Sequence, residues 1–268
     1  MKKLLAIAVF LLLGVMKIPL ESAATRSLRG SGLLEPPPDI GLRESLGQVG
    51  FAASLGGLRS LVASITVLQA VEAFEDVDWG RLDSLYTLAT RLQPRYPAYW
   101  VQAAEHMAFD AASSYRFDQR RSYAISEELF EAHVRRGIEV LREGLRHNPD
   151  APRLWTRLGE IYSQRAGKPL RPGDRLGPLT GDPANAAECY LRGREKGGLL
   201  IYERLGAYEL VKLGDPASLT RAYEIILRHY RLGQRTPRVI QELKVLEEKL
   251  NIPAPGRIPD SLPPAARK

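Results

Sequence analysis

The chain of 268 residues contains a single cysteine, Cys189. One cysteine cannot form an intramolecular disulfide or a zinc-binding thiolate cluster, and beside Tyr190 in a helical pattern we expect a buried, inert thiol. The four histidines form no H-x3-H pair, and phosphate-loop, G-x-S-x-G and Gly-rich dinucleotide motifs are absent. We therefore predict no catalytic residues, no metal site, no cofactor and no small-molecule substrate. An enzyme with an unrecognised site remains an alternative.

Strand signals are also missing, because no alternating apolar and polar run is bounded by turn residues. Helix signals are frequent. Asp182, Asp215 and Thr236 each precede a proline, as N-caps do, and glycines stand at 167, 197, 214 and 233, where preceding helices should end. We expect an all-α fold, with helices near 40–76 (or broken at Gly56–Gly57), 79–93, 97–117, 123–147, 152–166, 183–196, 199–213, 216–232 and 237–250.

The sequence contains an internal repeat. The segment 94–100 returns fifty-five residues later at 149–155, and each copy separates two helical patterns. Trp155, Leu158, Gly159 and Tyr162 then follow with the spacing W-x2-L-G-x2-Y. A second spacing, of small and large residues that let helices approach closely, occurs three times: Leu82/Tyr86/Ala89, Gly137/Leu141/Gly144 and Ala186/Tyr190/Gly193.

These spacings resemble the first and second helices of tetratricopeptide (TPR) repeats, over roughly Leu58 to Leu250. The resemblance implies a TPR-like α-solenoid of stacked helical hairpins, with about four irregular repeats, and a function in protein binding. The repeat lengths depart from the 34 residues of the family, and an irregular helical bundle is the alternative fold.

The first residues have the pattern of an export signal. Lys2 and Lys3 precede the apolar run 4–16, and small residues at 22–24 offer a cleavage point. We predict that residues 1–24 are a signal peptide or a retained signal anchor. The body is then exported, either periplasmic or anchored in the inner membrane and facing the periplasm. A second apolar segment, 49–70, has Arg59 as its only charge, and we expect a buried helix there, with bilayer contact as the alternative.

The remaining segments complete the domain organisation. Residues 25–39 form a Pro-rich linker, 40–250 the TPR-like repeat domain and 251–268 a disordered Pro-rich tail. The net charge of +7 arises from basic residues interleaved with acidic ones, without a base-reading motif. We therefore predict no nucleic-acid partner and attribute the excess charge to solubility or to attraction towards an anionic envelope surface.

The resemblance places the binding surface on the first helix of each hairpin. The expected partner-binding residues there are Glu105 and Phe109 on one helix and Arg153, Thr156, Glu160 and Gln164 on the next. Apolar residues at the matching positions, such as Val101 on the first of these helices and Ala207 on the helix 199–213, are expected to pack instead. A basic, Pro-rich insertion near 167–175 adds Lys168, Arg171 and Arg175, which would dock an acidic partner unless the insertion is merely a tolerated surface loop.

Together these features predict a non-catalytic protein–protein interaction scaffold or adaptor of the bacterial cell envelope, with a protein or peptide partner. The alternative is an accessory subunit of a membrane complex, retained in the bilayer by its N-terminal segment.

Overall fold

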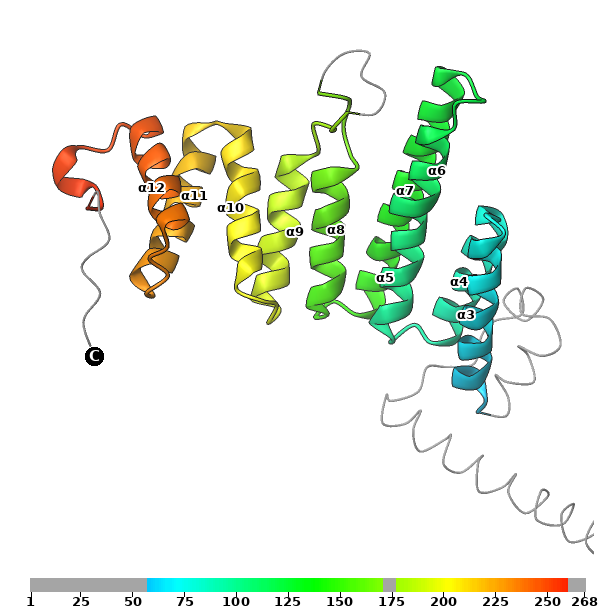
Figure 1. The fold of residues 1–268 in the computed structure, drawn as a ribbon. Coiled ribbons are helices and arrows are strands. Elements are labelled where there is room, and N and C mark those ends of the chain that lie inside the picture. Colours follow the sequence, from blue (N-terminus) through cyan, green and yellow to red (C-terminus); the bar gives the residue numbers. More distant parts are fainter. Residues whose placement is uncertain (1–56, 171–176, 260–268) are drawn as a thin grey trace, which may run out of the picture. The chain divides into compact units, whose positions relative to one another are not determined.

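A computed structural model describes residues 57–170 and 177–259, and over these residues the fold is all-α, as predicted (Figure 1). The extended backbone pairing found there is an isolated antiparallel bridge between Pro169 and Leu179. The described chain divides between Pro94 and Arg95 into two compact units, which are treated separately below. The predicted signal segment 1–24 and linker 25–39 lie outside the described residues, as does 40–56.

The first unit is a hairpin of α3 (Arg59–Glu75) and α4 (Trp79–Leu92). Small residues of α3, such as Ala63 and Ala70, are buried, and the guanidinium of Arg59 donates a hydrogen bond of 3.2 Å to the carbonyl of Arg91 at the end of α4. This bond satisfies one of the carbonyls that a helix leaves unpaired at its C-terminus.

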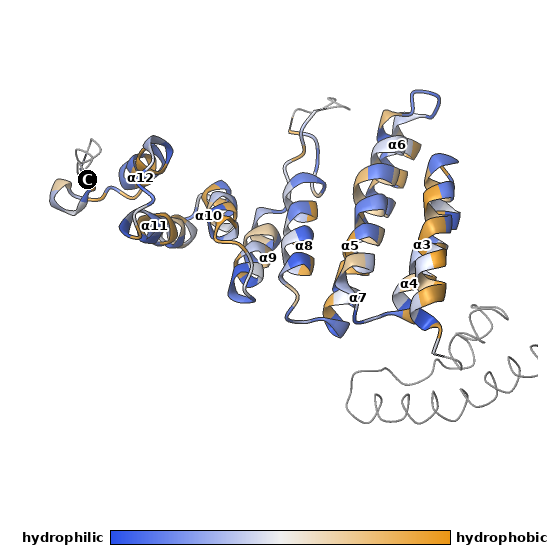
Figure 2. Ribbon diagram, turned by 60° about the horizontal axis from the view of Figure 1, so that its bottom comes forward, coloured by the Kyte–Doolittle hydropathy of each residue, from blue (hydrophilic) through white to orange (hydrophobic). Residues whose placement is uncertain are grey.

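Large apolar residues on another side of α3 are exposed, namely Leu61, Ile65, Leu68 and Val71, and so is Leu58 immediately before the helix. Figure 2 shows this hydrophobic colouring along α3. The predicted apolar segment 49–70 is described only from residue 57 onwards. Within the described residues, no helix combines the length and apolar character needed to cross a membrane.

The second unit consists of α5 (Pro97–Glu105), the π-helix η1 (His106–Ala111), α6 (Ala112–Phe117), α7 (Tyr123–His147), α8 (Pro152–Gln164), α9 (Pro183–Glu195), α10 (Ile201–Leu213), α11 (Pro216–Arg231) and α12 (Pro237–Lys249). Helix α7 packs against α5, η1 and α6, α9 against α8 and α10, and α11 against α10 and α12. Helices α5 and α8 also touch. Packing is thus between helices that are neighbours or near neighbours along the chain.

The predicted start and stop signals are confirmed. The side chains of Asp182, Asp215 and Thr236 accept hydrogen bonds from the backbone N–H three residues further on. The glycines at 167, 197, 214 and 233 have φ between 75° and 95°, which a side chain would disfavour. Local sequence therefore fixed the helix ends to within about two residues.

The predicted close approaches between helices are confirmed at the repeated small positions. A Cβ on Gly137 would lie 2.7 Å from the Cβ of Ala108, and one on Gly159 would lie 3.1 Å from the ring of Tyr190. Likewise a Cβ on Gly144 would lie 2.7 Å from Trp100. At Gly137 and Gly144 a Cβ would overlap the facing atoms, and at Gly159 it would be a tight contact, so these glycines allow the helix pairs to approach closely.

One irregularity was not predicted. The sequence indicated one continuous helix over 97–117, but its middle turn is the π-helix η1. There the ring nitrogen Nδ1 of His106 lies 2.8 Å from a carboxylate oxygen of Asp110. A π turn adds a residue to the helix and rotates the following side chains relative to an ideal α-helix.

The prediction of a disordered tail is wrong for its first nine residues. Residues 254–256 form a short 3-10 helix, and Ile258 is buried in the core made by α9, α10, α11 and α12. The backbone N–H of Ile258 donates a 2.7 Å hydrogen bond to Glu247, whose side chain is fully buried on α12. The high proline content does not prevent this packing, because one apolar anchor and two charge-assisted hydrogen bonds hold the segment, the second from the Lys244 ammonium to the Ile258 carbonyl. Residues 260–268 lie outside the described part.

Candidate functional site

The candidate site lies on the solvent-accessible sides of α8, α10 and α12, and of the predicted partner-binding residues it includes Arg153, Glu160 and Gln164, all on α8. On α8, Arg153, Arg157, Glu160 and Gln164 follow at spacings of three and four residues and therefore form one stripe. The corresponding accessible residues are Tyr208 and Lys212 on α10 and Arg238, Gln241, Glu242 and Val245 on α12. We call these ten residues the first-helix face. Helices α8 and α10 are the first helices of the packed pairs α8–α9 and α10–α11, and α12 follows the second pair.

At the junction of α5 and α8, the structure brings two predicted residues together. The guanidinium of Arg157 on α8 forms an ion pair of 2.5 Å with Glu105 on α5 and a second, short one with Glu160. Partial burial raises the pKa of Glu160, the nearby charge of Glu105 raises it further, and the positive charge of Arg157 opposes both effects. Glu105 and Glu160 are therefore both ion-paired with Arg157, and a binding partner would contact the two carboxylates together with this guanidinium.

Two other predicted residues are less accessible than expected. Thr156 is buried, and its methyl group lies where a side chain on Gly193 of α9 would be, so it does not belong to the first-helix face. The correction follows from helix geometry, because the accessible stripe of α8 is centred on Arg157. Phe109 is half-buried beneath the guanidinium of Arg165, 4.6 Å from its ring centre.

Helices α8 and α10 are joined by a buried carboxylate. The Ser163 hydroxyl donates a 2.6 Å hydrogen bond to Glu209, and the Lys212 ammonium lies 2.7 Å from the same oxygen. Burial raises the pKa of the neighbouring Tyr190, and the negative charges of Glu160 and Glu209 add to this effect. Glu209 thus connects two consecutive hairpins.

Helices α10 and α12 are joined by a second carboxylate. Glu242 accepts hydrogen bonds from the Tyr208 hydroxyl at 2.7 Å, from Arg204 at 3.2 Å and from Arg238 at 2.9 Å. Both guanidinium groups also lie over the Tyr208 ring, within 6 Å of its centre. Burial raises the pKa of Tyr208, and its hydrogen bond to Glu242 raises it further, so the phenol remains a hydrogen-bond donor.

The inserted loop is described at its base only. Lys168 is exposed, and its backbone pairs with Thr180 through a 2.8 Å hydrogen bond, while Arg116 of α6 donates a 2.7 Å hydrogen bond to the carbonyl of Gly177. Arg171 and Arg175 fall in 171–176, outside the described residues. The base of the insertion is therefore tied to the helices, and its role in docking stays a prediction.

The burial of several other residues can be compared directly with what the sequence indicated. Val101 and Ala207 are buried and pack in the core, as expected for the apolar members of their helices. Cys189 is buried, and desolvation raises its pKa to about 12, which keeps the thiol protonated and unreactive at neutral pH. Trp155 is only half-buried, with the guanidinium of Arg192 over its ring, whereas Leu158 and Tyr162 of the same motif are buried.

Sequence reasoning missed the residues that connect the hairpins to each other, above all Arg157, Glu209, Tyr208 and Glu242. Their signals are weak: a stripe of charged residues on α8 and an Arg238–Glu242 pair one helical turn apart. The same signals occur on ordinary exposed helix surfaces, so only the packed structure distinguishes connecting residues from exposed ones.

Within residues 57–170 and 177–259, no three His, Cys, Asp or Glu side chains converge in a geometry that would hold a metal ion. No family model matches the sequence, and no curated protein matches it as a relative.

Proposed function

We propose that this chain is a non-catalytic adaptor of the bacterial cell envelope, whose TPR-like hairpins stack as a solenoid and bind a protein segment on the first-helix face. The TPR-like spacings and the close helix contacts at Gly137, Gly144 and Gly159 support the stacking of hairpins. The export pattern of residues 1–24 supports the envelope location.

One observation carries the binding proposal. Consecutive first helices are joined sideways by polar contacts, Arg157 to Glu105, Ser163 to Glu209 and Tyr208 to Glu242. The helices therefore present a continuous, fixed surface, and a surface already held in place costs little ordering entropy on binding. Its arginines outnumber its glutamates, which favours an acidic partner.

Site-specific photo-cross-linking of the full-length protein in its native envelope tests this proposal. A benzoylphenylalanine at Gln164, which is exposed on α8, should give a defined protein adduct, and one at Glu139, exposed on α7, should not. Arg153→Glu should reduce the Gln164 adduct, whereas the matched change Arg135→Glu on α7 should leave it unchanged. Equal adducts at both positions, or none at Gln164, would contradict the proposal.

A second candidate is an accessory subunit of a membrane complex, and the exposed apolar residues Leu61, Ile65 and Leu68 of α3 favour it. Envelope fractionation separates the two. The adaptor proposal expects a chain cleaved near Ala24 in the soluble periplasmic fraction, and the second candidate expects an uncleaved chain that resists extraction by alkaline carbonate.

A further inference from the structure

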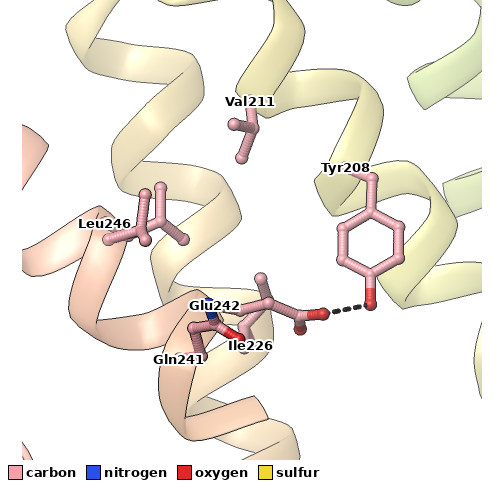
Figure 3. Close-up of a pocket in the computed structure, with 7 residues that line it drawn as sticks. Tyr208, Val211, Ile226, Gln241, Glu242 and Leu246 are labelled. Atoms are coloured by element: carbon pink, nitrogen blue, oxygen red, sulfur yellow. Dashed lines mark hydrogen bonds between the residues drawn. The ribbon is translucent and has the colours of Figure 1, made fainter. Parts of the chain in front are cut away.

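The first-helix face contains an apolar pocket between α10 and α12, with α11 as its floor (Figure 3). Its apolar lining comes mainly from Val211, Ile226, Val245 and Leu246, and its volume is about 280 Å³. Ligand sites usually measure about 300–1,000 Å³, so this pocket lies at the small end of that range and has room for one large side chain. Val245, 44% exposed, stands at the accessible side of the pocket.

The pocket has a polar side formed by Tyr208 and Glu242, whose hydrogen bond Figure 3 shows. Arg204 and Arg238 both bind the Glu242 carboxylate, so two guanidinium charges face one carboxylate. The Nε atom of Arg204 is buried and makes no hydrogen bond. About three quarters of the Arg238 side chain is exposed, which leaves its charge available to a ligand.

An apolar pocket beside an excess positive charge selects the chemistry of its occupant. An aliphatic or aromatic side chain would gain free energy by leaving water, and a carboxylate near it on the same chain would meet Arg238. A basic segment would instead meet uncompensated like charge, which disfavours it.

From this geometry we propose that the α10–α12 pocket is the anchor site for a partner peptide that inserts one large apolar side chain and places an Asp or Glu, a few residues away, against Arg238. This inference rests on the proposed function and deepens it by naming the partner chemistry.

The test selects peptides from a displayed random 12-residue library on the full-length protein. Selected peptides should share a large apolar residue with Asp or Glu within four positions. The affinity of one selected peptide is then measured by fluorescence anisotropy for the wild type and for variants whose folding is checked by circular dichroism.

Val245→Trp fills the pocket from an exposed position and should weaken binding about tenfold or more, as loss of an anchor pocket does. Leu232→Trp is the matched control, since Leu232 is 68% exposed in the turn after α11, and it should leave binding unchanged. Arg238→Ala should weaken binding about threefold, and this loss should shrink at high salt.

Selected peptides that bind Val245→Trp as tightly as wild type, or that lack the acidic residue, would overturn the inference. A selection that yields no peptide sensitive to Val245→Trp, or cross-links from Gln241 to residues 260–268 of the same chain, would also overturn it. The proposed function is judged separately, by the cross-link at Gln164 on α8, so that either can fail without the other.

Discussion

The close contact between α5, η1 and α7 gives the most direct test of the packing. In Gly137→Ala, the new Cβ would lie 2.7 Å from the Cβ of Ala108 and 2.9 Å from the backbone oxygen of Ala104. Carbon atoms pack best at about 3.5–4.0 Å, so the two helices must separate by a large part of an ångström. A backbone oxygen cannot rotate away as a side chain can.

The magnitude follows from two opposing effects. Alanine is favoured over glycine inside a helix by about 1 kcal/mol, and forcing an extra methyl group into a packed core costs about 1–3 kcal/mol, occasionally more. Because a backbone contact limits relaxation here, we expect the upper part of that range and a net destabilisation of about 1–2 kcal/mol. Gly159→Ala should be milder, because its nearest contact is the Tyr190 ring at 3.1 Å.

Urea unfolding followed by circular dichroism measures these changes as shifts in the transition midpoint. Glu139→Ala is the control, since Glu139 is exposed on the same helix as Gly137. The reasoning would be refuted if Gly137→Ala were as stable as the wild type or more stable, because α7 would then be free to gain the helix propensity of alanine without a steric cost.

Three further predictions concern single side chains. Ile258→Ala should destabilise the protein by about 2 kcal/mol, because removing a buried branched side chain leaves a cavity. Deletion of 260–268 is the control. An equal urea midpoint for Ile258→Ala and wild type would contradict the packing of the tail. Cys189, with a pKa of about 12, should resist iodoacetamide at pH 8 in the native protein and react in urea, and rapid native alkylation measured by mass spectrometry would show that the thiol is not buried. Burial raises the pKa of Glu160, so its ionised carboxylate destabilises the folded state at pH 7, and this penalty is lost as the pH falls through the pKa of the folded protein. Wild type should therefore gain stability relative to Glu160→Gln between pH 7 and pH 4. If the difference between their urea midpoints moves the other way, the charge of Arg157 outweighs burial.

The sequence by itself determined the helices and their ends. N-caps such as Asp182 and C-terminal glycines such as Gly214 act within a few residues, so local physics is sufficient to place them. It also determined which glycines allow helices to approach, because Gly137 and Gly159 recur at fixed spacings from large residues. The burial of Cys189 followed from its helical neighbourhood.

Tertiary structure alone decided which side of each helix is accessible and how the hairpins are connected. No recognisable local signal marks the π turn at His106–Ala111. Thr156 is buried because α9 covers it. Ile258 is ordered by Glu247 on α12, a contact that proline content hides. The pocket beside Glu242 exists because α10, α11 and α12 converge there, and the residues that form it are far apart in sequence. Helix ends depend on neighbours along the chain, whereas faces, joints and pockets depend on neighbours in space.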